Sequence, residues 1–188
     1  TTKLPDKPNE VGLWYGDNNE LLHDSRLFSP NGSEIKDFRP LLGDGTKNYF
    51  DQATSRLYYQ KDQAIGFLDP ISQSATLLLN QDGILSYQPK KDKLWLISTD
   101  SRRTILQSFA LPAGPSKLEL ELPTVGTYKF LDNNSAWLSL YDSQNQTLYL
   151  VNPESTSIKP VIVKNVLSWQ WVDDNTLIYN NNWEIFRL

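Results

Sequence analysis

The chain has 188 residues with 18 basic and 22 acidic side chains, a formal net charge of −4 and no cysteine. This composition excludes disulfides, thiolate metal sites and cysteine nucleophiles, and the lack of a concentrated basic run argues against binding of DNA or RNA through this segment. No stretch of 18 apolar residues occurs, so the sequence predicts no membrane-spanning helix.

The sequence contains no methionine, even at position 1. Since a translated chain begins with methionine, we expect a mature or excised segment from which a signal peptide, a membrane anchor or an upstream domain has been removed. Attachment to a membrane is expected only through such an upstream anchor.

A short pattern, an apolar run closed by a proline, recurs along the chain. The prolines of its four copies are 40 to 42 residues apart and are Pro30, Pro70, Pro112 and Pro153. An apolar-aromatic run precedes each copy and appears a fifth time near the C-terminus, at 11–15, 57–59, 94–97, 136–140 and 177–179. A period of about forty residues indicates a repeat architecture in which each copy is one supersecondary unit.

Within one period the sequence predicts four short strands bounded by turn residues, which in the fourth copy are 127–131, 136–141, 147–151 and 158–163. No window of ten or more residues shows a helical apolar period, so the predicted fold class is all-β. Four antiparallel strands repeated at this period are typical of a β-propeller blade.

We therefore predict a single β-propeller domain over 1–188 with about five four-stranded blades, at roughly 9–42, 43–80, 81–123, 124–164 and 165–188. The first copy lacks a clear first strand, so 11–15 is interpreted as a second strand. The fifth copy lacks its outermost strand, and we expect an N-terminal strand at Thr1–Leu4 to close this last blade. Two stacked sheets of a β-sandwich are the competing architecture.

Two segments resemble known propeller blades. Ser29–Ile35 resembles the Ser-Pro-Asp-Gly turn of TolB-like and WD-repeat blades, and Asn181–Arg187 is similar to the Gly-Asn-Trp-Glu-Ile-Tyr segment that ends a TolB-like blade. The resemblance implies a propeller fold and a bacterial periplasmic setting. Similar propellers there are free envelope proteins or C-terminal sensory domains of membrane-anchored transcription regulators. No binding residue is carried over from it.

The alternating strand directions predict where ligands bind. The turn between the second and third strands of a blade lies at the same end as the link to the next blade, so these loops form one rim. The predicted ligand or partner contacts on this rim are Asp17, Asn18, Asp62, Asp100, Arg102, Arg103, Asp142, Asn145 and Asn181. Arg102 and Arg103 are a cationic pair suited to a carboxylate or phosphate. The competing interpretation is that turn chemistry alone selects Asp and Asn at these positions.

The tryptophans are interpreted mainly as core residues. Trp14, Trp95 and Trp137 occupy equivalent repeat positions within apolar strands, where a large ring packs between sheets. Trp169 and Trp171 share one face of a strand, which predicts either a blade interface or an exposed aromatic patch.

The sequence offers little for catalysis. His23 is the sole histidine, which argues against zinc, and no Gly-x-Ser-x-Gly motif supports a serine nucleophile. A glycosidase needs two or more converging carboxylates, but Asp51 is the lone acid among the predicted inward-facing residues. We expect no enzyme activity and no cofactor; calcium binding stays open, although no Asp-x-Asp-x-Asp-Gly loop occurs.

The function predicted from the sequence is a non-enzymatic, extracytoplasmic recognition or sensor module in the bacterial periplasm. It is expected to bind a partner protein or a small ligand at the loop rim and to be monomeric as a domain. A structural scaffold or surface adhesin, and a glycan-binding or glycan-processing propeller, are the alternatives.

Overall fold

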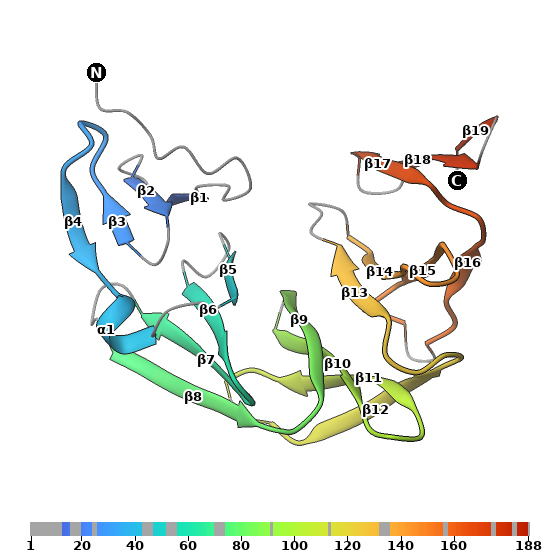
Figure 1. The fold of residues 1–188 in the computed structure, drawn as a ribbon, viewed down its shortest axis with the longest axis horizontal. Helices are drawn as coiled ribbons and strands as arrows, with labels where there is room; N and C mark the ends of the chain where they lie inside the picture. The colour runs from blue at the N-terminus through green and yellow to red at the C-terminus, as the bar shows by residue number, and fades with distance from the viewer. Residues whose placement is uncertain are drawn as a thin grey trace. The chain divides into compact units, whose positions relative to one another are not determined.

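The structure, a computed structural model, describes residues 13–15, 20–23, 26–42, 47–51, 56–69, 74–90, 92–112, 114–131, 136–155, 158–173, 176–181 and 184–187. Within these ranges the regular structure consists of strands β1 to β19 and one four-residue helix, α1 (Arg39–Leu42). The strands form five antiparallel sheets that follow one another along the chain (Figure 1). The predicted all-β class is confirmed. Within the described part of the chain, no helix has the length and apolar character needed to cross a membrane.

The chain divides into two compact units, Thr1–Gln81 and Asp82–Leu188. In the first unit the strands are β1 (Leu13–Tyr15), β2 (Glu20–His23), β3 (Arg26–Phe28) and β4 (Glu34–Asp37) in the first sheet, and β5 (Lys47–Asp51), β6 (Arg56–Lys61), β7 (Ala64–Asp69) and β8 (Ser74–Asn80) in the second. Within each sheet the strands are hydrogen-bonded in chain order.

The core of the first unit consists mainly of leucines and draws on both sheets and on α1. Its buried members are Leu27, Phe38, Leu42, Leu57 and Leu68. Alternate residues of β3 and β6 face this cluster because successive side chains of a strand point to opposite faces. Helix α1 follows β4 directly and contributes its last residue, so the short helix closes the core between the two sheets.

Asp37 fixes the start of α1. Its Oδ1 accepts a hydrogen bond from the backbone N of Arg39 at 2.9 Å, and its Oδ2 accepts one from Arg39 Nη2 at 2.7 Å. The side-chain hydrogen bond from Arg39, then the backbone bond, lowers the pKa of Asp37 to about 2. A carboxylate at this position satisfies an otherwise unpaired N–H of the first helical turn.

We predict that Asp37 titrates near pH 2 in the folded chain and that Arg39→Ala raises its pKa toward the usual value of about 3.9. Because the folded-state pKa is depressed, the contribution of Asp37 to stability is present above the unfolded-state pKa and is lost as the pH falls through the folded value. A carboxyl-carbon NMR titration measures both midpoints. Arg103→Ala is the control, and an Asp37 midpoint that ignores Arg39→Ala contradicts the prediction.

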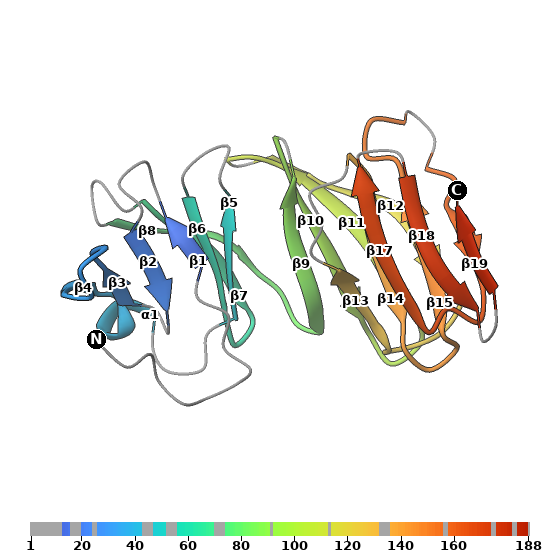
Figure 2. The same ribbon diagram turned by 90° about the horizontal axis from the view of Figure 1, so that it is seen from above.

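The second unit contains three sheets. The strands are β9 (Ile84–Lys90), β10 (Lys93–Thr99), β11 (Thr104–Ala110) and β12 (Ser116–Leu122) in the third sheet, β13 (Tyr128–Leu131), β14 (Leu138–Asp142), β15 (Thr147–Val151) and β16 (Val161–Val163) in the fourth, and β17 (Ser168–Asp173), β18 (Thr176–Asn181) and β19 (Glu184–Arg187) in the fifth. The strands β17, β18 and β19 lie side by side (Figure 2).

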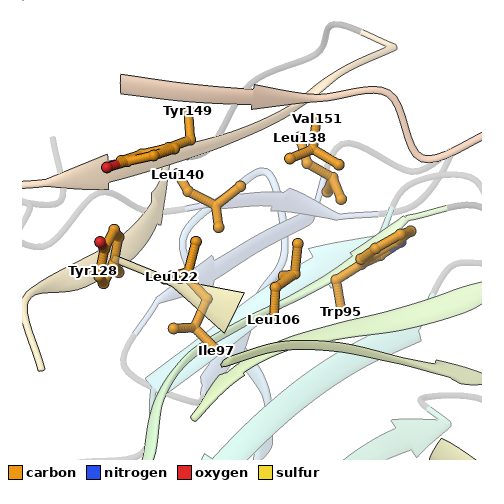
Figure 3. Packing of buried hydrophobic residues seen from close by; sticks show 9 residues of the cluster. All are labelled: Trp95, Ile97, Leu106, Leu122, Tyr128, Leu138, Leu140, Tyr149 and Val151. Atoms are coloured by element: carbon orange, nitrogen blue, oxygen red, sulfur yellow. The ribbon is translucent and has the colours of Figure 1, made fainter. Parts of the chain in front are cut away.

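Two apolar clusters hold these three sheets together. The cluster between the third and fourth sheets contains Trp95, Ile97, Leu106, Leu122, Tyr128, Leu138, Leu140, Tyr149 and Val151 (Figure 3). The cluster between the fourth and fifth sheets contains Leu148, Leu150, Val163, Val166 and Leu177. The fourth sheet thus buries both of its faces, which explains why every residue of β15 is buried.

The four described tryptophans of the second unit, Trp95, Trp137, Trp169 and Trp171, lie between sheets. Trp95 is fully buried, and Trp137 packs against the cluster between the fourth and fifth sheets. The ring of Trp169 lies 4.7 Å from that of Tyr141, and Nε1 of Trp171 donates to Oγ of Ser139 at 3.0 Å. The face shared by Trp169 and Trp171 is therefore a sheet interface and not an exposed patch. The side chain of Trp14 lies outside the described residues.

The sheets follow the predicted repeats: four have four strands, the last has three, and each lies within one predicted copy. The first copy differs from its prediction, because Leu13–Tyr15 is the first strand of its sheet and not the second. The cause is that 20–28 contains two short strands, β2 and β3, so the sheet has four strands with Leu13–Tyr15 as the first. Thr1–Leu4, expected to close the last blade, lies outside the described residues.

Candidate functional site

The links between sheets are hydrogen-bonded to the turns between second and third strands or to the strand residues that flank these turns. In the first unit, N of Gln81 donates to O of Gln63 at 2.9 Å. In the second unit the corresponding pairs are Thr99 N to Gly83 O at 2.8 Å, Gly126 N to Thr104 Oγ1 at 2.8 Å, Val166 N to Gln146 O at 2.7 Å and Leu167 N to Asn180 O at 3.0 Å. Turns and links therefore lie at one end of their sheets, the arrangement that alternating strand directions predict.

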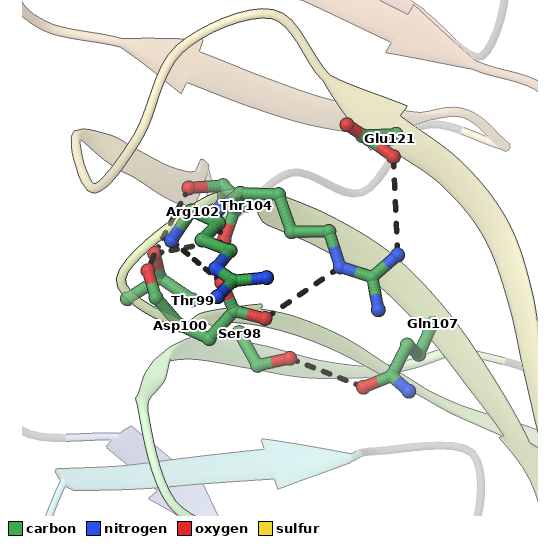
Figure 4. A network of polar contacts seen from close by, with 8 residues as sticks. Ser98, Thr99, Asp100, Arg102, Thr104, Gln107 and Glu121 are labelled. Atoms are coloured by element: carbon green, nitrogen blue, oxygen red, sulfur yellow. Dashed lines mark hydrogen bonds and ion pairs between the residues drawn. The ribbon is translucent and has the colours of Figure 1, made fainter.

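Asp100 organises the turn between β10 and β11. Its Oδ1 accepts hydrogen bonds from the backbone N of Arg102 at 2.7 Å and of Arg103 at 3.0 Å (Figure 4). These two backbone bonds lower the pKa of Asp100. Oγ1 of Thr99 spans the same turn and donates to the carbonyl of Arg103 at 3.1 Å. The turn is closed by its own side chains, so its conformation does not depend on a ligand.

The two predicted arginines of this turn have different surroundings. Arg103 is held between two acids, with its Nε 3.6 Å from Oδ2 of Asp100 and its Nη1 4.0 Å from Oε2 of Glu121. Arg102 is exposed, and in the described part of the chain its guanidinium group forms no hydrogen bond or ion pair. Among the described residues, Arg103 therefore has acids beside it, whereas Arg102 has none, and both side chains are exposed.

Asp142, at the end of β14, is the most densely bonded acid of the second unit. Its Oδ1 accepts hydrogen bonds from Thr127 Oγ1 at 2.6 Å and from the backbone N of Gln144 and Asn145 at 3.0 and 3.2 Å. Its Oδ2 lies 3.0 Å from Thr124 Oγ1 and accepts from Asn145 Nδ2 at 2.8 Å. The side chain has no solvent exposure.

The pKa of Asp142 follows from this environment. Burial raises it, but the hydrogen bonds from Thr127, Asn145 and Thr124 outweigh burial, so the pKa lies below its usual range. Asp142, a predicted ligand contact, is fully buried in the structure. It is a positioning residue that ties the 143–146 turn to the link 123–127.

The same anchoring includes two tyrosines beneath the turn. The hydroxyl of Tyr128 accepts a hydrogen bond from the backbone N of Thr124 at 3.2 Å and lies 2.9 Å from Thr124 Oγ1. The rings of Tyr128 and Tyr149 lie 5.7 Å apart at an angle of 62°. Burial, and then a hydrogen bond with Tyr128, raises the pKa of Tyr149. The polar network therefore continues directly into the apolar core.

Above this buried network lies a set of exposed side chains. The four residues of the 143–146 turn are exposed, and on either side of them Val125 and Leu167 have exposed fractions of 50% and 45%. Val125 belongs to the link that Asp142 anchors, and Leu167 to the link that bonds Gln146 and Asn180. We name Arg102, Val125, 143–146 and Leu167 the turn surface.

The other predicted contacts lie elsewhere or play another part. Asn145 belongs to the turn surface, but its Nδ2 is used to bond Asp142. Asn181 ends β18 opposite Glu184 and is half-buried. Asp62 is exposed at φ 53° in the turn between β6 and β7 of the first unit. Asp17 and Asn18 lie outside the described residues, between the first and second strands of the first sheet.

The aliphatic members of the turn surface were missed at the sequence level. Val125 and Leu167 stand in short polar links, and Gly126 follows the first of them at φ 86°. The presence of an aliphatic residue within a predicted turn was the sequence feature that could have identified them as exposed contact residues. In the described residues, no group of three or more His, Asp or Glu side chains is placed to hold a metal ion.

Comparison with known proteins identifies the fold. No family model matches the chain, and no curated protein matches its sequence. A chain in the crystal structure of a nidogen/laminin complex matches with a TM-score of 0.59 and 12% identity, over 86% of this chain and 66% of that one. A gluconolactonase from Xanthomonas campestris matches with a TM-score of 0.59 and 13% identity, over 95% of this chain and 71% of that one. Both are β-propellers, so the β-propeller prediction is confirmed.

Proposed function

We propose that the chain is a non-enzymatic recognition module that binds a partner protein through the turn surface of its second unit. The observation that carries this proposal is the buried Asp142 carboxylate, which bonds the 143–146 turn to Thr124 and Thr127 of the preceding link. A surface that is ordered before binding loses little conformational entropy when a partner docks, so more of the contact free energy appears as affinity.

The composition of the turn surface suits a protein partner. Two exposed aliphatic residues, Val125 and Leu167, belong to links that are bonded to the turn with the exposed residues Gln144 and Asn145. Apolar contacts surrounded by polar groups that form hydrogen bonds are typical of transient protein interfaces. The free guanidinium of Arg102 adds a site for a carboxylate of the partner.

The acids of this region support a binding role more than a catalytic one. Both oxygens of Asp142 are occupied by donors, and Asp100 bonds two backbone amides and lies beside Arg103. A general acid or base must be able to reach the proton that it transfers. The buried Asp142 does not meet this requirement, which favours recognition over the enzymatic alternative.

We extend the proposal to the location and context of the module: outside the cytoplasm, in a bacterial envelope, as a sensor domain or a free envelope protein. The cysteine-free composition supports this setting. The resemblance of Ser29–Ile35 and Asn181–Arg187 to TolB-like blades supports it as well.

A photoreactive benzoylphenylalanine in place of Val125 tests the proposal. It is expected to crosslink a discrete protein from an envelope extract of the source cells, and excess unmodified chain should compete for that protein. Arg102→Glu combined with Leu167→Asp is expected to lower the crosslinking yield about tenfold or more, because one apolar anchor and one charge are lost from the interface.

The control carries the same photoreactive residue at Asp92, between β9 and β10, at the opposite end of the third sheet. Equal crosslinking from positions 92 and 125, or a yield that the double variant leaves unchanged, contradicts the turn surface as the binding site. Hydrolysis of gluconolactone by the purified chain contradicts the non-enzymatic role.

A further inference from the structure

Three residues other than glycine have a positive φ in the described part of the chain. They are Asp62 at 53°, Gln146 at 48° and Asn165 at 58°. This left-handed conformation is uncommon for residues with a Cβ atom. Aspartate and asparagine adopt it more readily than others, because their short polar side chains bond to the nearby backbone. Glutamine lacks this advantage, so Gln146 is the exceptional member of the three.

Gln146 ends the turn between β14 and β15. Asp142 and Thr147 are paired across the two strands, and the turn consists of the four residues between them. A turn residue in the left-handed conformation is most often glycine, which has no Cβ atom to crowd the backbone. A glutamine at this position therefore makes the turn less stable than a glycine would.

The side chain of Gln146 does not offset this cost within the described part of the chain. It is exposed, and its amide group forms no hydrogen bond with a described residue. Its neighbour Asn145 differs, since Nδ2 of Asn145 donates to Asp142. The backbone carbonyl of Gln146 accepts a hydrogen bond from Val166 N at 2.7 Å. Glycine has the same carbonyl, so this link to the turn does not require a glutamine.

We propose that the side chain of Gln146 is a specificity-determining contact of the turn surface and that it binds a peptide group of the partner protein. Residues held in sparsely populated backbone conformations are concentrated at functional sites. A primary amide has one acceptor and two donors, which match the N–H and C=O of a peptide group. This inference rests on the proposed function and adds a recognition residue and the chemical group that it binds.

Thermal unfolding tests the conformational cost without a partner. Gln146→Gly is expected to raise Tm by about 3 °C, because glycine adopts the left-handed conformation freely and keeps the acceptor for Val166 N. Gln146→Ala keeps a Cβ atom and is expected to unfold within about 1 °C of the wild type. A Tm that falls in the glycine variant would show that the side chain supports the fold, which overturns the inference.

Binding is expected to change in the opposite direction from stability. Gln146→Gly and Gln146→Ala are each made in the chain with benzoylphenylalanine at Val125, and the envelope extract is the probe. Each is expected to lower the crosslinking yield about fivefold, because both lack the amide. A yield that either variant leaves unchanged overturns the inference. Gln146→Glu should lower the yield as well, since a carboxylate accepts but does not donate. Crosslinking at the wild-type level by this variant contradicts the peptide-group contact.

Asn165→Gly is the matched control for backbone freedom. Asn165 is exposed, has a positive φ and precedes Val166, but it is not part of the turn surface. The control frees the backbone beside the same hydrogen bond and retains the amide of Gln146, so it should crosslink like the wild type. Equal loss in the two glycine variants overturns the inference. If the chain with an unchanged Gln146 crosslinks no discrete protein, the proposed function fails and the inference fails with it, whereas every other contrary result contradicts the inference alone.

Discussion

Asp142→Ala is expected to lower the free energy of unfolding by about 3 kcal/mol, because the hydroxyls of Thr124 and Thr127 and the amides of Gln144 and Asn145 lose a shared buried acceptor. For a chain of this length, that loss corresponds to a decrease in Tm of about 10 °C. Urea unfolding followed by tryptophan fluorescence measures it, since Trp171 and Trp169 pack against the fourth sheet.

Asp100→Ala is the matched control for this prediction. Asp100 and Asp142 each accept hydrogen bonds from two backbone amides of the turn that follows, but Asp100 is exposed. The exposed variant is expected to lose much less stability than Asp142→Ala, since water replaces the lost acceptor. Equal losses at the two positions would show that turn chemistry alone, and not the buried network, determines the cost.

The pH dependence of the same network has a defined sign. The pKa of Asp142 is lower in the folded chain than its usual value, so the stability that its ionised form contributes is lost as the pH falls through the folded-state pKa. Asp142→Asn removes this contribution at neutral pH. Its stability is therefore expected to fall less steeply than that of the wild type between neutral and acidic pH.

The second large effect is expected for Gly83→Ala. Gly83 has φ +71°, and a Cβ atom at this position would lie 1.9 Å from the carbonyl oxygen of Thr99. The backbone must move to admit the methyl group, which breaks the hydrogen bond from Thr99 N to Gly83 O. We expect a loss of about 3 kcal/mol from the conformational cost and the lost bond together. Thermal unfolding of the purified variant measures it.

Gly126→Ala separates the two causes. Gly126 also has a positive φ, +86°, but a Cβ atom there would meet nothing within 4 Å. Its substitution is expected to cost about 1 kcal/mol, the conformational contribution alone. If both alanine variants unfold at the same temperature, close contact with Thr99 is not what requires glycine at position 83.

The repeat period explains how much of the fold could be predicted. Proline and aromatic spacing mark each sheet, and the turns after β6, β10 and β14 follow from local Asp and Asn chemistry. The first sheet was misassigned because β1 to β3 are only three or four residues long. Strands of that length lack enough alternation to locate their boundaries.

The site was less predictable, for a reason visible at Asp100 and Asp142. Both residues have the same local sequence role, an aspartate that begins a turn. Asp142 is buried because Thr124 and Thr127 from another strand connection cover it, and a pattern within one turn does not contain that information. The role of Trp169 and Trp171 was undecided for the same reason, since it depended on a partner strand, β14.

The hydrogen bonds between links and turns have a consequence for how such a chain can lengthen. In the link after the fourth sheet, two consecutive backbone amides donate to different sheets. Val166 N donates to Gln146 O, which precedes it in the chain, and Leu167 N donates to Asn180 O, which follows it. A duplicated copy of the 124–164 segment would include its own equivalent of Gln146, the residue that accepts the hydrogen bond from the link that follows. Its turn between second and third strands would be available to the next link in the same way. Gene duplication could thus add a blade that reuses the existing type of hydrogen bond between links and turns. The number of blades could then change by one in a single evolutionary step.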